Sequence, residues 1–321
     1  MARPSHRYTL QITSSKDRRS HHNIGTWTRT GIWSHENGAF VPEPGMRGES
    51  GGAALAIACR LRIQWCGGDG MQDPDNLARK FLYYPDRLPA GMPPPGWAGG
   101  AEEVWIKCED GVRIHGLWWP EPEGAPVILF LHGNAQEVYS WSLVRRELEP
   151  AGCRLLLIDY HGYGKSGGEP HEAGLYLDGK ASLRWLYDNG IEDSHLVVFG
   201  KSLGGGVACE IARERELMAL VLESTFTSLA GVARKLFPFL PAGIPLGEVY
   251  DSVSKLPHAR CPVLVIHGEM DELIPVGEGL ELYAAAPEPK ELYLVPGAGH
   301  NDVSLVAGSA YARKIASFLD A

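Results

Sequence analysis

The sequence lacks a hydrophobic run long enough to span a membrane. In the N-terminal region the most apolar stretch, Ala53 to Cys59, is ended by Arg60 and Arg62, far short of the roughly 20 residues that cross a bilayer. The first 30 residues begin with several bases but contain no apolar run of roughly 7–15 residues, so no secretory signal peptide is predicted. We therefore expect a cytoplasmic protein whose contact with membranes is peripheral at most.

Paired cysteines and an excess of positive charge are also absent. The six cysteines stand singly, without a C-x-x-C pair, so we interpret them as reduced. The 321 residues carry 39 acidic and 30 basic side chains, a net charge of −9, so no basic field attracts a phosphate backbone and nucleic acid is not an expected partner. No metal-binding spacing such as H-E-x-x-H occurs, and neither a metal nor a cofactor is expected.

The composition is nevertheless that of a globular protein, with 44% apolar residues available for a core. Residues 1–75 are rich in Ser, Gly, His, Arg and Thr without a sustained helical or strand period, which predicts a disordered or loosely ordered extension. A linker rich in Pro and Gly, Leu88 to Gly100, precedes a change of pattern. Residues 76–321 are predicted to form one domain.

Strands and helices alternate along this domain. Two strands, Val104 to Cys108 and Val112 to Trp119, are predicted to form a hairpin around Glu109-Asp110-Gly111. Short apolar strands and helices then alternate, with strands at 127–131, 155–158, 196–199, 219–222, 263–266 and 291–295, and helices at 138–148, 175–187, 203–214, 279–286 and 305–319. Continuous apolar runs are typical of strands covered on both faces. The predicted fold class is α/β, a mostly parallel, doubly wound sheet with an N-terminal antiparallel hairpin, and functional residues are expected at the carboxyl ends of its strands.

A serine stands between one of these strands and the next helix, in Gly200-Lys201-Ser202-Leu203-Gly204. This is the G-x-S-x-G pattern in its strand, turn and helix context. The turn forces Ser202 into a strained backbone conformation, and the two glycines let the neighbouring backbone pass. We predict that Ser202 is a nucleophile. The alternative, a serine in a glycine-rich helix start that only allows close packing, is disfavoured by the flanking strand and helix.

A serine nucleophile needs a base within hydrogen-bond reach and a third group that orients the base. Asp271 follows the strand at 263–266, and His300 lies in a glycine-rich loop after the strand at 291–295. These two residues are the predicted acid and base. Glu223 and Asp302 are alternative acids. His267 and Glu269 are expected to satisfy backbone groups near the acid loop.

Acyl transfer also needs two N–H donors for the developing oxyanion. One is predicted to be the backbone N–H of Leu203, the residue after the nucleophile. The other is expected in His132-Gly133-Asn134-Ala135, after the strand at 127–131, and is assigned to the N–H of Asn134. The side chain of His132 is then expected to be structural and to hold the shape of this loop.

A short cap is predicted at about residues 226–260, between two strands of the sheet. It is unusually apolar, and Phe237, Phe239, Leu240 and Ile244 are predicted to line an acyl channel beside Ser202. The alternative is that these side chains only cover the edge of the sheet.

A different class of function is suggested by Gly162 to Gly167, which matches G-x-G-x-x-G. No helix opens after it and no βαβ unit begins there, so a nucleotide site is disfavoured.

Together these motifs resemble those of the α/β-hydrolase superfamily, and within it the Bem46-like serine hydrolases. The resemblance covers about residues 77–321 and rests on Phe81-Leu82-Tyr83-Tyr84-Pro85, Phe130-Leu131-His132-Gly133-Asn134, Asp159-Tyr160-His161-Gly162-Tyr163-Gly164-Lys165-Ser166, Gly200-Lys201-Ser202-Leu203-Gly204-Gly205, His267-Gly268-Glu269-Met270-Asp271 and Gly297-Ala298-Gly299-His300-Asn301-Asp302. It implies an α/β-hydrolase fold with a nucleophile elbow, a catalytic triad and an oxyanion hole. The order Ser202, Asp271, His300 is the order of the triad in that fold.

Relatives of this kind are serine esterases, and some eukaryotic members remove palmitoyl groups from cysteine. The resemblance therefore implies cleavage of small or lipid-like acyl esters through an acyl-enzyme intermediate, with action as a thioesterase on acylated proteins as the alternative. A catalytically silent hydrolase fold that serves as a binding module is a third hypothesis, which an intact triad disfavours. Two features depart from the group: His161 stands where relatives usually carry Arg, and the N-terminal membrane helix or Cys-rich tail of many relatives is not found.

Overall fold

The computed structural model describes residues 7–12, 27–34, 39–42, 82–236 and 249–320, with side chains described within residues 82–232 and 249–320. The chain divides into two units, Met1–Gly70 and Met71–Ala321. Every nucleophile, base, acid and oxyanion-hole residue predicted above belongs to the larger unit. Among the described residues, no helix has the length and apolar character that crossing a bilayer would require.

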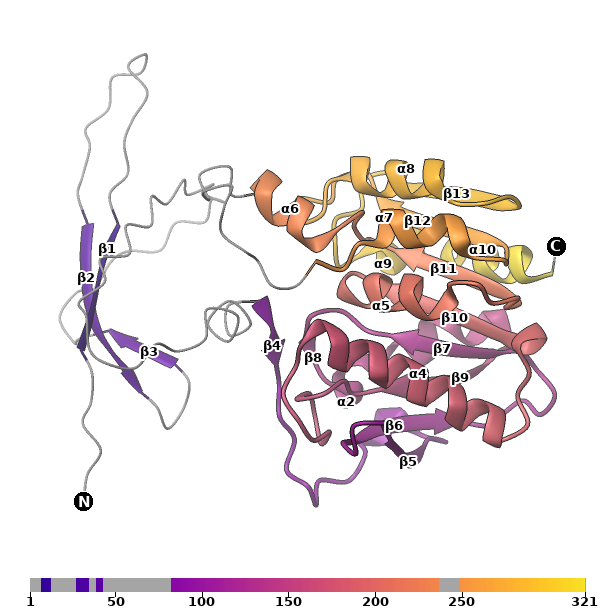
Figure 1. Cartoon of the computed structure of the whole chain (residues 1–321), viewed down its shortest axis with the longest axis horizontal. Coiled ribbons are helices and arrows are strands. Elements are labelled where there is room, and N and C mark those ends of the chain that lie inside the picture. Colours follow the sequence, from indigo (N-terminus) through magenta and orange to yellow (C-terminus); the bar gives the residue numbers. More distant parts are fainter. Residues whose placement is uncertain (1–6, 13–26, 35–38, 43–81, 237–248, 321) are drawn as a thin grey trace, which may run out of the picture. The chain divides into compact units, whose positions relative to one another are not determined.

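The smaller unit contains a three-stranded antiparallel sheet in the order β1-β2-β3. Its strands are β1 Arg7–Ile12, β2 Trp27–Ser34 and β3 Ala39–Pro42 (Figure 1). The sequence pattern of residues 1–75, for which a disordered or loosely ordered extension is predicted, did not predict these three strands. Each is short and pairs with a segment elsewhere in the chain, Arg7 opposite Ile32 and Gly31 opposite Pro42, so a search for a sustained period misses it. The rest of residues 1–75 lies outside the described residues.

The larger unit is built on an eight-stranded sheet in the order β13-β12-β11-β10-β7-β9-β6-β5. Its strands are β5 Glu102–Lys107, β6 Arg113–Trp119, β7 Val127–Leu131, β9 Arg154–Ile158, β10 Leu196–Lys201, β11 Ala219–Glu223, β12 Val263–Gly268 and β13 Lys290–Val295. β5 and β6 form the predicted antiparallel hairpin and β6 is antiparallel to β9, whereas the other neighbours are parallel. A two-residue strand, β4 Tyr84–Pro85, pairs separately with β8 Ala135–Gln136.

Helices cover both faces of this sheet (Figure 1). Along β7 the side chains of Val127, Leu129 and Leu131 enter one buried cluster, and those of Ile128 and Phe130 enter the other, because successive residues of a strand face opposite sides. The first cluster includes residues of α4 Glu172–Asp188, α5 Leu203–Ala212 and α8 Val276–Ala285, and the second includes residues of α2 Val138–Trp141, α3 Val144–Leu148, α9 Val303–Ala307 and α10 Ser309–Leu319. The short helices α6 Leu229–Leu236 and α7 Ser252–Lys255 precede β12.

Two predicted helices are divided in the structure. The helix predicted over 138–148 is α2 followed by α3, and the hydroxyl of Ser142 donates to the carbonyl of Tyr139 at 2.7 Å, so a side chain replaces a main-chain donor there. The helix predicted over 305–319 is α9 followed by α10, separated by Gly308 with φ 54° and ψ −136°. In both cases a local feature at one residue, Ser142 or Gly308, accompanies the break in the helix. The spacing of apolar residues does not reveal such a break.

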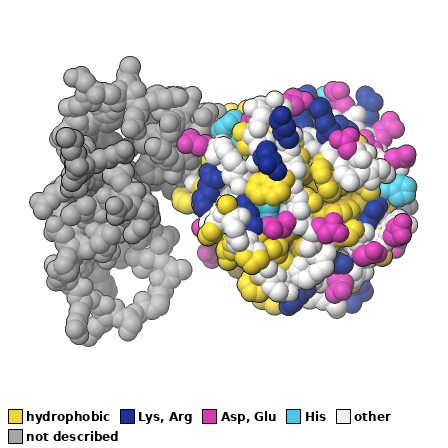
Figure 2. Space-filling view, turned by 90° about the horizontal axis from the view of Figure 1, so that it is seen from below, with side chains coloured by type: hydrophobic (Ala, Val, Ile, Leu, Met, Phe, Trp, Pro, Cys, Tyr) yellow, Lys and Arg dark blue, Asp and Glu magenta, His cyan; other side chains and the backbone are white. Residues whose placement is uncertain are grey.

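Charged side chains protect the edge strand β5. Glu102, Glu103 and Lys107 are exposed along it, and the guanidinium of Arg113 lies 5.1 Å from the centre of a ring of Trp105. Figure 2 views the molecule from below Figure 1, where β5 and β6 lie, and shows acidic and basic side chains interspersed among apolar ones. Such charges discourage an exposed strand from pairing with another sheet.

A buried histidine near the hairpin turn joins two carboxylates. His161 Nδ1 lies 2.5 Å from Asp178 Oδ1, and its Nε2 lies 2.9 Å from Asp110 Oδ2. Asp178 also accepts the N–H of His161 at 2.8 Å and the thiol of Cys108 at 3.3 Å. Burial alone would lower the pKa of His161, but the hydrogen bonds and charges of Asp178 and Asp110 raise it above its ordinary value. The cationic form is thereby favoured at this position, where relatives are expected to carry Arg.

We expect His161→Gln to destabilise the domain more near pH 6 than near pH 9. A histidine with a raised folded-state pKa stabilises the fold fully below its ordinary pKa of about 6.5, and this contribution is lost as pH rises through the folded value. The difference between wild type and variant in free energy of unfolding, measured by urea titration, should therefore shrink by about 1 kcal/mol between the two pH values. An equal difference at both would mean that the charge of the imidazolium contributes nothing.

Candidate active site

Ser202 occupies a sharp turn between β10 and α5. Its φ of 52° and ψ of −118° are values that residues with a side chain rarely adopt, at a cost of about 1–3 kcal/mol. A Cβ at Gly204 would lie 2.0 Å from the carbonyl oxygen of Leu131, and one at Gly200 would lie 2.6 Å from the Cβ of Ala208. Only glycine fits at these two positions, as the sequence motif predicts. The turn leaves Ser202 partly exposed.

The end of β11 holds the main chain of this turn. The N–H of Ser202 donates to the carbonyl of Glu223 at 2.9 Å, and the hydroxyl of Thr225 donates to the carbonyl of Ser202 at 2.7 Å. The main-chain N–H and carbonyl of Ser202 therefore both find hydrogen-bond partners in the segment 223–225. Thr225 itself is buried, so its hydroxyl has little freedom to leave.

The three residues predicted to form a nucleophile, a base and an acid lie side by side. His300 Nε2 is 3.0 Å from Ser202 Oγ, and His300 Nδ1 is 2.7 Å from Asp271 Oδ2. They follow β10, β12 and β13, whose carboxyl ends share one edge of the sheet. An imidazole that bridges a hydroxyl and a carboxylate in this way can accept the hydroxyl proton.

Asp271 is held as a carboxylate by hydrogen bonds from several directions. Its Oδ1 accepts the N–H groups of Leu273 at 2.9 Å and Ile274 at 2.7 Å. His267 Nε2 lies 3.4 Å from Asp271 Oδ2 and 2.8 Å from the carbonyl of Ile274, so His267 contacts a backbone group as expected. Burial by itself would raise the pKa of Asp271, but the hydrogen bonds from His267, His300 and Ile274 lower it well below its usual range.

The two alternative acids have other partners. The carboxylate of Glu223 accepts the hydroxyl of Tyr311 at 2.5 Å and lies 2.6 Å from the Nζ of Lys201. Asp302 accepts the N–H of Gly299 at 2.7 Å. Of the three candidate carboxylates, the structure brings Asp271 to the ring of His300.

The two residues predicted to donate to the oxyanion lie in different segments, the start of α5 and the loop after β7. Leu203 is the first residue of α5, and the first N–H groups of a helix have no partner within that helix. Asn134 follows β7 in a loop that borders the nucleophile, because a Cβ at Gly133 would lie 3.5 Å from the Cβ of Ser202. Both predicted donors therefore belong to segments that lie next to Ser202.

Known proteins are similar to this chain in sequence. A family model described as the alpha/beta hydrolase fold matches residues 126–249. An uncharacterized protein of Mycobacterium tuberculosis is 36% identical over 244 residues, which cover 75% of this chain and 86% of that protein. Protein bem46 of Schizosaccharomyces pombe is 30% identical over 257 residues, which cover 75% of this chain and 85% of that protein. The chain belongs to the Bem46-like α/β-hydrolases.

Solved structures extend this family assignment to three dimensions. An esterase of Pyrococcus furiosus is similar to this Bem46-like protein with a TM-score of 0.61 and 25% sequence identity, covering 74% of this chain and 98% of that one. The predicted fold class is therefore confirmed, with its mostly parallel sheet and N-terminal hairpin. The chain is a hydrolase of the α/β type.

In this Bem46-like protein, three aromatic side chains to which the sequence motifs assign no role contact the loop after β7. Trp141, Tyr160 and Tyr163 each donate a hydrogen bond to a carbonyl of residues 132–135. The segment 159–166 contains two of them, and the spacing Tyr-x-x-Tyr after a buried strand was the available signal. Their partners could not be inferred, because β7 and β9 become neighbours only in the folded sheet.

The predicted acyl-channel residues Phe237, Phe239, Leu240 and Ile244 lie outside the described residues, as does the middle of the predicted cap, residues 237–248. The two ends of this segment are anchored. Thr227 donates its N–H and its hydroxyl to Glu278 at 2.9 and 2.6 Å. The N–H groups of Val249 and Tyr250 donate to Glu172 at 2.6 and 2.9 Å. Beside Asp271, the apolar side chains of Met270 and Leu273 are exposed.

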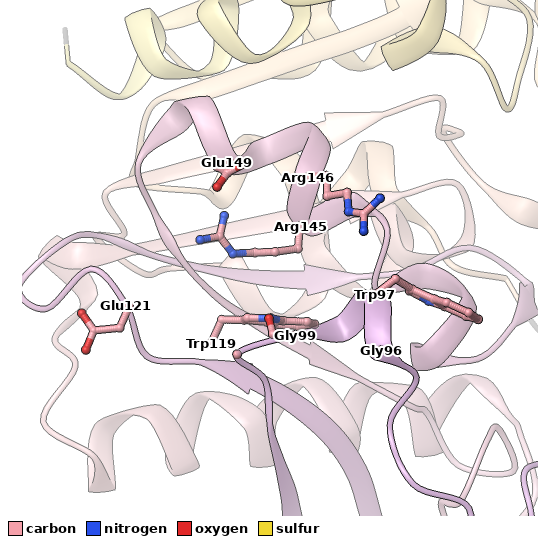
Figure 3. A pocket seen from close by; sticks show the side chains of 9 residues that line it. Gly96, Trp97, Gly99, Trp119, Glu121, Arg145, Arg146 and Glu149 are labelled. Carbon is pink, nitrogen blue, oxygen red and sulfur yellow. The ribbon is translucent and has the colours of Figure 1, made fainter.

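The structure also contains a hollow of about 410 Å³, which is shown in Figure 3. It is lined by Gly96, Trp97, Gly99, Gly100, Trp119, Glu121, Arg145, Arg146 and Glu149. Trp119, which lines the hollow, pairs with Leu155 near the beginning of β9. Ser202 instead follows the carboxyl end of β10. Both β10 and β9 are parallel to β7 and therefore run in the same direction. The hollow therefore belongs to the opposite edge of the sheet and is not where Ser202 would meet a substrate.

Within the described part of the chain, one cluster has spacing suited to a metal ion. Its side chains are Cys108, His161 and Asp178, whose ligand atoms all lie within 4.8 Å of one another. These atoms are already joined by the hydrogen bonds described above, and the three residues are buried. The cluster shares no residue with the Ser202 site, and we assign it a structural role.

Proposed function

We propose that this Bem46-like hydrolase is a serine esterase that cleaves carboxylic acyl esters through an acyl-enzyme intermediate. The observation that supports the proposal is the unbroken chain of hydrogen bonds from Ser202 Oγ through His300 to Asp271, at 3.0 and 2.7 Å. A serine hydroxyl is activated as a nucleophile when it is hydrogen-bonded to an imidazole base whose tautomer is fixed by a carboxylate. The likeness to an esterase of Pyrococcus furiosus points in the same direction.

In the first half-reaction, Ser202 Oγ attacks the ester carbonyl carbon while His300 Nε2 takes the hydroxyl proton. Asp271 stabilises the resulting imidazolium and keeps its ring in place. The carbonyl oxygen becomes an oxyanion that accepts hydrogen bonds from the N–H groups of Leu203 and Asn134. The C–O bond to the alcohol then breaks, the alcohol takes the proton from His300, and the acyl group stays on Ser202.

In the second half-reaction, water replaces the alcohol. His300 Nε2 takes a proton from water as its oxygen attacks the acyl carbon, and the same two N–H groups stabilise the second oxyanion. Collapse of this intermediate breaks the bond to Ser202 Oγ, which takes the proton back from His300. The carboxylic acid leaves and the starting state is restored. No metal or cofactor takes part in this sequence.

The substrate that we propose is an ester of a medium or longer acyl chain, small or lipid-like. Met270 and Leu273 flank Asp271 as exposed apolar side chains, 63% and 51% accessible, and the cap residues predicted to line an acyl channel are also apolar. The same machinery could cleave a thioester, because only the leaving group changes. Acylated proteins are therefore the alternative substrate class, and no described contact favours them.

We expect kcat/KM to rise from acetyl to octanoyl along a series of p-nitrophenyl esters. Each buried methylene contributes about 0.8 kcal/mol, or up to about fourfold per carbon. The measurement is steady-state hydrolysis below the critical micelle concentration of each ester, with octanoyl-thioester assayed in parallel and Ser202→Ala as the background control. A preference for acetyl would contradict the apolar substrate and leave the esterase mechanism standing. Faster cleavage of the thioester would favour the alternative class.

A further inference from the structure

The loop after β7 turns four consecutive carbonyl groups toward aromatic side chains. The donors and acceptors are Tyr160 Oη to His132 O at 3.0 Å, His132 Nδ1 to Gly133 O at 2.7 Å, Tyr163 Oη to Asn134 O at 3.0 Å and Trp141 Nε1 to Ala135 O at 2.8 Å. We call these four side chains, His132, Trp141, Tyr160 and Tyr163, the carbonyl clamp. No carbonyl of residues 132–135 is left to turn freely toward the serine.

The second of these bonds controls the peptide that carries a predicted oxyanion donor. In a trans peptide the C=O and the following N–H point in opposite directions. The carbonyl of Gly133 shares its plane with the N–H of Asn134, so holding the carbonyl against His132 directs that N–H to the other side. Because Gly133 borders Ser202, a flip of this single peptide would present a carbonyl oxygen where the developing oxyanion needs a donor.

His132 is suited to act only as a donor at Nδ1. Its side chain is buried, and within the described part of the chain its Nε2 has no hydrogen-bond partner. Since the carbonyl of Gly133 only accepts, the Nδ1 atom must carry the proton, and burial, which lowers the pKa of His132, keeps the ring neutral. The ring stacks on Trp141 at 5.8 Å between centres and lies 4.5 Å from Tyr160, so it is packed in one orientation.

The other clamp residues fix the peptides on either side. Tyr163 also donates to the side-chain oxygen of Asn134 at 2.9 Å, and the side-chain amide of Asn134 donates to the carbonyl of Leu82 at 2.5 Å. Tyr160 and Tyr163 are fully buried. The loop is thus held at its main chain and at the side chain of Asn134 before any substrate is bound.

We propose that His132 is a positioning residue that holds the peptide between Gly133 and Asn134 in the orientation required by the oxyanion hole, supported by Tyr160, Tyr163 and Trp141. The proposal rests on the esterase function proposed above, because a reaction without a tetrahedral oxyanion has no use for the N–H of Asn134. In this proposal the carbonyl clamp holds the oxyanion hole in its working geometry before the negative charge develops on the substrate oxygen. Such preorganisation is what makes an oxyanion hole effective in serine hydrolases.

The test compares His132→Phe, which keeps an aromatic ring and removes the donor, with His132→Asn, whose amide nitrogen replaces Nδ1. We expect His132→Phe to lower kcat about 100-fold, as loss of one oxyanion donor does, with KM changed less than about twofold. His132→Asn should recover at least tenfold of that loss. Tyr163→Phe, which acts on the neighbouring peptide, should cost about three- to tenfold. Tyr187→Phe is the matched control, because its hydroxyl bonds Asp193 and should not affect kcat.

A second readout separates positioning from damage to the fold. A trifluoromethyl ketone forms a tetrahedral adduct on serine, so its inhibition constant should weaken in parallel with kcat/KM across the variants. A partly misfolded enzyme would lose active sites, counted by the endpoint of fluorophosphonate labelling, and keep the wild-type inhibition constant. Unchanged kcat per active site and unchanged inhibition in His132→Phe would overturn the proposal. If that variant does not fold, His132→Asn and Tyr163→Phe carry the same test. A wild type that neither labels nor hydrolyses would instead refute the proposed esterase.

Discussion

Replacing Ser202 by alanine should abolish ester hydrolysis while the domain stays folded. The hydroxyl forms the acyl-enzyme, so without it the alternative is direct attack by water, and kcat is expected to fall by about 10⁴–10⁶-fold. Covalent labelling by a fluorophosphonate should disappear at the same time. The side chain of Ser202 is not needed to satisfy the turn, because the bonds to Glu223 and Thr225 involve its main chain. Thermal unfolding should therefore change little.

Ser194→Ala is the matched control for this substitution. The hydroxyl of Ser194 also lies near an imidazole, 3.1 Å from Nδ1 of His195, but it is exposed and precedes β10 rather than following it. That variant should keep wild-type turnover and wild-type labelling. If Ser202→Ala kept its activity, or if labelling moved with Ser194, the proposed nucleophile would be wrong and the binding-module hypothesis would gain support.

Asp271→Asn should lower kcat by about 10⁴-fold with little effect on substrate binding. The amide is neutral and can turn its N–H₂ toward His300 Nδ1, which favours the wrong tautomer of the base. In the native enzyme the carboxylate accepts His300 at 2.7 Å and two main-chain N–H groups, so its position is set by three donors. Steady-state kinetics on one ester, with labelling rates measured in parallel, is the direct test.

The two alternative acids provide controls of known geometry. Asp302→Asn removes the negative charge of the group that accepts Gly299 N–H, and Glu223→Gln removes the charge paired with Lys201, but neither carboxylate contacts His300. Asp302→Asn in particular should retain most of the activity. An active Asp271→Asn together with an inactive Asp302→Asn would transfer the role of the acid to Asp302.

The pH dependence follows from the low pKa of Asp271. Since hydrogen bonds keep this carboxyl ionised well below its usual range, it adds no proton uptake of its own above about pH 4. The acid side of the kcat/KM profile should then show a single ionisation to which Asp271 does not contribute, with activity rising with pH. Two ionisations on the acid side would show that Asp271 titrates with the base.

Much of the fold and the site could be predicted because the relevant signals are local. The fully buried strands of the eight-stranded sheet follow from apolar runs with turn residues at their ends, and β7 begins and ends at the predicted residues, Val127 and Leu131. The nucleophile turn follows from sterics within five residues, since a Cβ at Gly200 or Gly204 would overlap its neighbours. The three strands of the smaller unit were missed, because their short segments gain regularity only by pairing.

By itself, the sequence determined the order of strands and helices, the strained turn at Ser202 and a short set of candidates for the base and the acid. Only the tertiary structure showed that Asp271, and neither Glu223 nor Asp302, contacts His300, because His300 lies 29 residues from Asp271 and 98 from Ser202 in sequence. Only the fold also revealed that side chains following β9 hold the carbonyls that follow β7. The physical reason is the same in both cases. Secondary-structure propensity and steric fit act between residues that are near in sequence. Hydrogen-bond partners at the edge of a sheet depend instead on which strands lie side by side in the folded sheet.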